Sequence, residues 1–181
     1  GSSIVQERTH AAAMKSQIWL LDPRPNLPSM VDAVQNGFLL SEASNTPVIL
    51  QLRIRACHVT GRFVSRDNVR PAMTLRNVAE NPSRDTARIV LPPALFTHEQ
   101  EKISRRWPRA VEFVKKAGLN EHFGPSMGEV GIIVQGGLFN SLNRALELEH
   151  LSNQLGATQV PILCLNVTYP LVPEELTRFC E

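Results

Sequence analysis

The feature that most constrains the fold is an apolar run, a helical repeat and a second apolar run in close succession. Residues 18–21 form the first run and residues 48–55 form the second. Between them, Val31, Val34 and Phe38 recur at spacings of three and four, which predicts an amphipathic helix with these side chains on its buried face. A strand, a helix and a strand within about forty residues make a βαβ unit. The two strands should therefore lie parallel, joined by a right-handed crossover.

The last third of the chain repeats this pattern. Residues 130–134 form an apolar strand, residues 135–137 a glycine turn and residues 160–167 a second strand, and a short helix follows over 174–180. The helix between the strands should end at Gly156 and bury Leu142, Ala145, Leu146 and Leu155. A second βαβ unit is therefore expected.

The two units are separated by a long connector and a helix. Residues 56–88 have no periodicity and are rich in arginine, which indicates a domain boundary and a segment that lies along a neighbouring surface. A capping box at Thr97 should open the helix, Gly118 should end it, and Pro108 should bend or split it. Its expected buried face consists of Ile103, Trp107, Val111 and Val114. The predicted fold is α/β, with two partial three-layer α/β/α units and mainly parallel sheets.

Composition excludes several classes of protein. The net charge of +2 over 181 residues gives no basic excess, so neither nucleic acid nor an anionic membrane surface is an expected partner. No apolar run is long enough to span a membrane. The three cysteines form no CxxC spacing, which disfavours a disulfide framework, a zinc site and a ligated iron-sulfur cluster within this chain. We expect a reducing, cytoplasmic location and no metal site.

Two places offer candidate binding residues. Arg53, Arg55 and His58 lie at or just past the carboxyl end of a predicted parallel strand, the edge where open α/β sheets bind ligands. The arginines suit a carboxylate or phosphate, and equally suit an interface. Gly136 and Gly137 lie in a strand-to-helix turn that either cradles an anion or simply allows a tight turn.

Several motifs resemble one enzyme family over nearly the whole chain. Residues 20–23, 41–50 and 53–59 resemble the end of the pyrimidine-binding thiamine diphosphate domain of indolepyruvate ferredoxin oxidoreductase alpha subunits. The TYPL motif at 168–171 and the PEEL motif at 173–176 are similar to the transketolase C-terminal-like domain that follows it in this family.

The resemblance implies a division of the chain at specific residues. Residues 1–62 would be the end of the thiamine diphosphate domain, residues 63–127 a linker and helix, and residues 128–181 a truncated transketolase C-terminal-like domain. Ser3 would belong to a Ser-Ser loop of the family. Together with Arg55 and His58, it would lie close to the substrate or cofactor.

The resemblance also implies a reaction. A 2-oxoacid, characteristically an arylpyruvate such as indolepyruvate, would be oxidatively decarboxylated on thiamine diphosphate. Electrons would leave through iron-sulfur clusters to ferredoxin, and coenzyme A would receive the acyl group. The remaining domains or subunits of the same oxidoreductase would be partners.

The chain also departs from the family's pattern. The glutamate that activates thiamine, the diphosphate and Mg²⁺ motif, and the cluster cysteines have no counterparts in it. We therefore expect a piece of a longer protein that neither binds cofactor nor catalyses alone, and that self-associates as a homo-oligomer because its sheet edges are open. The alternatives are a non-catalytic assembly module of another thiamine enzyme, such as a transketolase or a branched-chain dehydrogenase, and a free-standing nucleotide-binding protein.

Overall fold

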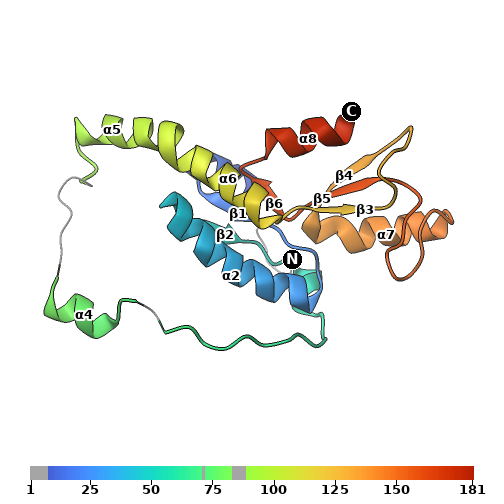
Figure 1. Cartoon of the computed structure of the whole chain (residues 1–181), viewed down its shortest axis with the longest axis horizontal. Helices are drawn as coiled ribbons and strands as arrows, with labels where there is room; N and C mark the ends of the chain where they lie inside the picture. Colours follow the sequence, from blue (N-terminus) through green and yellow to red (C-terminus); the bar gives the residue numbers. More distant parts are fainter. Residues whose placement is uncertain (1–7, 71, 83–88) are drawn as a thin grey trace.

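The chain forms two small adjoining sheets in a computed structural model that describes residues 8–70, 72–82 and 89–181. The first sheet holds, in order, β2 (Val48–Leu50), β1 (Trp19–Leu21) and β6 (Val167–Tyr169). The second holds β3 (Glu121–Phe123), β5 (Ile162–Leu165) and β4 (Ile132–Gln135). Helices accompany both sheets, and a long arm leaves the body and returns to it (Figure 1). The predicted α/β class is confirmed.

Each sheet is mixed. The pairs β1·β2 and β4·β5 are parallel, as both βαβ patterns predict, whereas β1·β6 and β3·β5 are antiparallel. The prediction of mainly parallel sheets is therefore only half correct. The antiparallel neighbours come from segments outside the two βαβ units. One of these segments, β6, carries the end of the chain into the first sheet.

Helix α2 (Leu27–Ser44) makes the predicted crossover between β1 and β2. Asn26 caps it, since its side-chain oxygen accepts a hydrogen bond from the Ser29 backbone N–H. The predicted buried face is wrong. The buried residues are Met30, Ala33, Leu40 and Ser44, whereas Val31, Val34 and Phe38 are exposed, Phe38 to 73%. Two apolar stripes share this helix, and the sheet and α6 (Trp107–Ala117) cover only one of them.

The second strand of the first unit is shorter than the predicted 48–55. Pairing with β1 ends at Leu50, and the next backbone hydrogen bond, from Gln51 N–H to the Leu21 carbonyl, is the last that β1 offers. Residues beyond it have no strand to pair with, and they turn into the short helix α3 (Ile54–Cys57).

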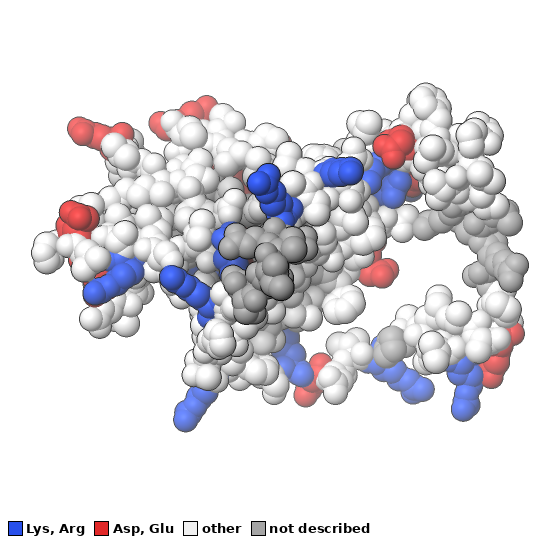
Figure 2. Space-filling view, turned by 180° about the vertical axis from the view of Figure 1, so that it is seen from behind, with Lys and Arg blue, Asp and Glu red and all other residues white. Residues whose placement is uncertain are grey.

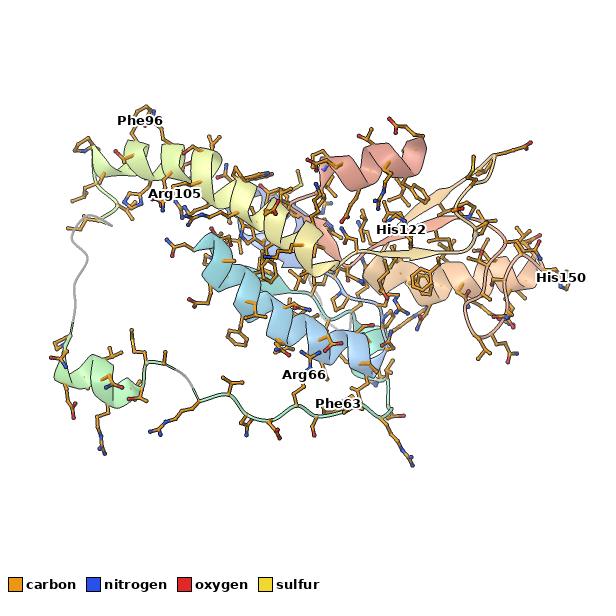
Figure 3. All side chains as sticks on the ribbon, in the orientation of Figure 1. Phe63, Arg66, Phe96, Arg105, His122 and His150 are labelled. Atoms are coloured by element: carbon orange, nitrogen blue, oxygen red, sulfur yellow. The ribbon has the colours of Figure 1, made fainter. Side chains whose placement is uncertain are left out.

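The predicted long connector is present as an extended arm. Its described part contains one helix, α4 (Leu75–Glu80), and stands away from the body (Figure 1). Figure 2 shows arginine side chains together with acidic ones on the arm. Near its start, Arg66 donates to Asp32 of α2 at 2.9 Å (Figure 3).

The long helix after the arm is split as Pro108 predicts. It consists of α5 (Ala94–Glu101), a π-helical turn over Lys102–Arg106, and α6. Proline lacks the N–H of a regular helix, and its ring crowds the carbonyl four residues earlier, so the turn before it widens. The helix begins at Ala94 rather than at a Thr97 cap, and Ile103 is exposed to 69% rather than buried, because the packed face begins only at Trp107.

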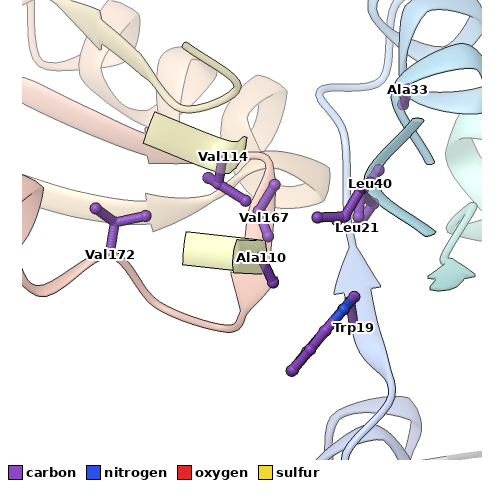
Figure 4. Close-up of a cluster of buried hydrophobic side chains, with 8 residues drawn as sticks. All are labelled: Trp19, Leu21, Ala33, Leu40, Ala110, Val114, Val167 and Val172. Carbon is purple, nitrogen blue, oxygen red and sulfur yellow. The ribbon is translucent and has the colours of Figure 1, made fainter. Parts of the chain in front are cut away.

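The first sheet, α2 and α6 enclose the main core. Trp19 lies at its centre, with its ring centroid 5.4 Å from Trp107 and 5.8 Å from Tyr169. Its indole N–H donates to the Ser44 hydroxyl at 2.7 Å. Figure 4 shows the buried members of this cluster, which are Trp19, Leu21, Ala33, Leu40, Ala110, Val114, Val167 and Val172. Helix α1 (Thr9–Ser16) contributes the buried Ala13.

The second unit differs from its prediction at its helix. A short 3-10 turn (Gly136–Leu138) leads into α7 (Phe139–Leu148), which ends eight residues before Gly156. The chain reverses at His150, where φ is +59°, and therefore Leu155 is 94% exposed. Phe139 and Leu146 provide the buried face, with Leu142 partly buried, whereas Ala145 is exposed.

The predicted strand 160–167 divides at Asn166. Its first part, β5, is the central strand of the second sheet, and its second part, β6, joins the first sheet. β5 therefore has neighbours on both sides, whereas β6 lies at an edge of the first sheet with β1 as its neighbour. Helix α8 (Pro173–Cys180) follows as predicted. Among the described helices, none combines the length and the hydrophobicity needed to cross a membrane.

Candidate functional site

The carboxyl ends of three strands from both sheets converge on one junction. Asp22 follows β1, Arg53 follows β2 and Gln135 ends β4. Asp22 is fully buried, and its Oδ2 accepts a hydrogen bond from Arg53 Nη2 at 2.6 Å. The same Nη2 donates to Gln135 Oε1 at 2.7 Å. One arginine therefore joins the first sheet to the second.

A second ion pair lies beside the first. Arg24 binds both carboxylate oxygens of Glu121, with distances of 2.6 and 2.7 Å. Asn166 Nδ2 donates to the same carboxylate at 2.8 Å and to the Leu119 carbonyl at 2.9 Å. Asn166 also holds the ends of β1, because the Asp22 N–H donates to its carbonyl at 2.8 Å.

Charge and burial oppose each other in this pair. Burial acts to raise the pKa of Glu121, but hydrogen bonds from Arg24 and Asn166 and the charge of Arg24 bring that pKa below its usual value. Burial acts to lower the pKa of Arg24, and the bond to Glu121 outweighs it and raises that pKa. Both groups are therefore held in their charged forms.

The glycine turn of the second unit fits directly against this junction. A Cβ on Gly136 would overlap the Asp22 carbonyl oxygen and lie 2.6 Å from Asn166 Oδ1. A Cβ on Gly137 would overlap Asp22 Oδ1 and lie 2.6 Å from Arg53 Cδ. Both positions therefore require glycine for close packing. Binding of an anion by the turn remains a prediction, and Gly137 borders a pocket.

That pocket lies at the outer side of the junction. It has a volume of about 360 Å³ and is lined by Pro25, Arg55, Val59, Gly137, Asn140, Ser141 and Arg144. It brings together two residues that the sequence singles out separately, Arg55 from α3 and Gly137 from the turn before α7. The amide of Asn140 holds the pocket's far wall, since it donates to the Pro25 carbonyl at 3.2 Å.

The other predicted residues lie elsewhere. His58 is exposed at the end of α3 and does not line the pocket, and Ser3 lies outside the described residues. Cys57 is exposed, and Cys164 is buried in β5, where burial raises the pKa of its thiol to about 12.

Sequence reasoning singled out Arg53 but missed the other residues that build the junction. Asp22 and Arg24 follow the first apolar run directly, which is a usable signal for polar groups at a strand's carboxyl edge. Glu121 and Asn166 have no such signal, because their role depends on two sheets being adjacent.

The described residues show no place for a metal cofactor. Nowhere in the described part of the chain do three histidine, cysteine, aspartate or glutamate side chains come together as a metal-binding group. These residues therefore do not fit an iron-sulfur cluster.

Comparison with known proteins supports a distant relationship. No family model matches the chain, and no solved structure matches it. A curated relative, the indolepyruvate oxidoreductase subunit IorA of Methanothermobacter thermautotrophicus, is 29% identical over 167 residues, which cover 91% of this chain. The chain spans 25% of that relative's length. The chain is thus a distant homologue of a subunit of an indolepyruvate oxidoreductase.

Proposed function

We propose that this chain is one segment of a subunit of a thiamine diphosphate-dependent 2-oxoacid oxidoreductase. The observation that carries the proposal is the alignment with IorA, which extends over 91% of the chain rather than over one motif. The TYPL motif contributes Thr168 and Tyr169 to β6 of the first sheet, and the PEEL motif forms the first half of α8.

The proposed reaction is that of the whole oxidoreductase. That enzyme would oxidatively decarboxylate a 2-oxoacid such as indolepyruvate, with thiamine diphosphate and iron-sulfur clusters as cofactors, ferredoxin as electron acceptor and coenzyme A as acyl acceptor. Other parts of the enzyme would supply the thiamine, Mg²⁺ and cluster sites. The division at residues 62 and 127 into the end of a pyrimidine-binding domain, a linker and a transketolase C-terminal-like domain belongs to the same proposal.

The contribution of this segment to the enzyme would be structural. Arg53, which is held by the buried carboxylate of Asp22 in the same sheet, reaches Gln135 of the second sheet, and Arg24 binds the half-buried carboxylate of Glu121, which fixes the relative position of the two units. Arg55 and His58 lie at the outer edge of that clamp, on and just after α3. In the complete enzyme they would be positioned to affect substrate affinity or turnover more than folding.

An apolar groove favours contact with the rest of the enzyme. It has a volume of about 430 Å³ and is lined by Ala33, Val34, Gly37, Phe38, Ser41, Pro47, Val48 and Leu50. It runs between α2 and β2, and β2 is an edge strand of the first sheet. Exposed apolar side chains beside an open strand edge are typical of subunit interfaces. A remaining domain, a partner subunit or a second copy would cover them.

The experiment uses the complete subunit, purified with its natural partners. We expect it to reduce ferredoxin only when an arylpyruvate, coenzyme A and thiamine diphosphate are all present. Arg55→Ala and His58→Ala should lower kcat/KM, and Arg76→Ala, on the exposed helix α4, should not.

Two results would contradict the proposal. An intact complex that turns over no 2-oxoacid would favour a non-catalytic assembly module. Wild-type kcat/KM in both Arg55→Ala and His58→Ala would show that these two residues have only a structural role.

A further inference from the structure

We propose that the pocket between α3 and α7 binds a phosphate group of a small molecule. Two guanidinium side chains, Arg55 and Arg144, border it from opposite elements, and no aspartate or glutamate is among its lining residues. Its volume of about 360 Å³ is within the range of small-molecule sites. The inference goes beyond the proposed function and does not depend on it.

Arg55 differs from the other arginines near the junction. Arg53 is paired with Asp22, Arg24 with Glu121 and Arg144 with Glu147. Within the described part of the chain, Arg55 has no acidic partner. An uncompensated guanidinium at a pocket has its full set of planar donors available for a bidentate oxyanion.

Arg144 can supply the second charge. It bonds to Glu147 through Nη1 at 2.7 Å, in a pair whose arginine side chain is 61% exposed. The Glu147 side chain is only 21% exposed, but water screens the mostly exposed guanidinium, so the pair contributes little free energy. The other nitrogens of Arg144 therefore remain available to an anion in the pocket.

The remaining lining groups suit a phosphate. Ser141 and Asn140 lie in the first turn of α7, and Gly137 leaves the turn before it without a side chain. The Ser141 hydroxyl and two guanidinium groups line the same pocket as possible donors, beside the Asn140 amide, which already donates to the Pro25 carbonyl. Two positive charges match a phosphate dianion better than they match the single charge of a carboxylate.

The test titrates the chain with inorganic phosphate and follows backbone amide resonances. We expect one saturable site, with the largest shifts at Gly137, Asn140 and Ser141. Arg55→Gln should weaken binding roughly tenfold, since a charge-assisted bidentate contact is lost. Arg76→Gln, on the exposed helix α4, is the matched control and should leave the affinity unchanged.

A second pair of variants distinguishes phosphate binding in the pocket from a general effect of net charge. Glu147→Gln should tighten phosphate binding, because it releases Arg144, whereas Glu149→Gln removes the same charge nearby and should not. Equal effects of the two glutamate variants, or of Arg55→Gln and Arg76→Gln, would overturn the inference. Absence of saturable binding, or tighter binding of an arylpyruvate carboxylate at the same amides, would also overturn it. The presence or absence of phosphate binding does not bear on 2-oxoacid oxidation by the complete enzyme, whereas arylpyruvate binding at these amides would support the role proposed there for Arg55.

Discussion

Arg53 and Arg66 make the same contact with an aspartate in two different regions of the molecule. At the junction, Arg53 pairs with Asp22 at 2.6 Å, and the two side chains are 28% and 0% exposed. On the arm, Arg66 pairs with Asp32 at 2.9 Å, and the side chains are 65% and 52% exposed. A buried carboxylate that loses its partner is left without solvation, whereas an exposed one returns to water. An Arg–Asp pair is therefore expected to stabilise the fold at the junction and to contribute almost nothing to the free energy of unfolding on the arm.

The largest expected effect is that of Asp22→Asn. This change leaves Arg53 facing a neutral group at a buried position and removes the charge that holds Arg53 against Gln135 of the second sheet. We expect the free energy of unfolding to fall by roughly 2–4 kcal/mol, somewhat below the usual cost for a fully buried pair because Arg53 is partly exposed. Urea unfolding measures it. Asp32→Asn on α2 is the control, and an equal loss in both variants would remove the distinction between the two regions.

Gly136→Ala tests the close packing of the same junction. The added methyl group would overlap the Asp22 backbone carbonyl, which cannot move without disturbing the end of β1. We expect a loss of about 1–3 kcal/mol in the free energy of unfolding. The matched control is Gly37→Ala within α2, where the new Cβ would lie 3.8 Å from its nearest neighbours. That change should be neutral or stabilise by up to about 1 kcal/mol. Equal stability of the two variants would contradict the close approach at Gly136.

The Arg24–Glu121 pair predicts a dependence of stability on pH. The pKa of Glu121 is lower in the folded protein than its ordinary value, so the stabilisation is complete above an unfolded pKa of about 4.3. It should be lost as the pH falls through the folded pKa. Unfolding of the wild type and of Glu121→Gln, compared between neutral pH and pH 3 or so, measures the difference. A difference that does not change with pH would show that the carboxylate charge contributes nothing.

The smallest expected effect is that of Arg66→Gln on the arm. Both members of its pair are more than half exposed, so the loss should stay below about 0.5 kcal/mol and shrink further at high salt. Urea unfolding at low and high ionic strength tests it. A loss as large as that of Asp22→Asn would mean that the arm is held on the body as firmly as the two sheets are held together.

The predictions from sequence pattern were correct where they depended on residues close together in the chain. The apolar spacing placed α2 and both parallel pairs, and Pro108 placed the split between α5 and α6. The same spacing chose the wrong face of α2, because Met30, Ala33 and Leu40 form a second apolar stripe on that helix. Periodicity identifies a helix with an apolar face, but only the neighbouring sheet decides which face is covered.

The candidate site shows the same limit. The pattern of residues alone determined that Arg55 follows a strand and that glycines precede a helix. The tertiary structure decided that both border one pocket, and that Asp22, Arg53 and Gln135 form the clamp beside it. It also decided that residues after Asn166 leave the second sheet for the first. The physical reason is that hydrogen bonds between strands and pairs between buried charges join residues far apart in the chain, and no local repeat records which distant segment will supply the partner.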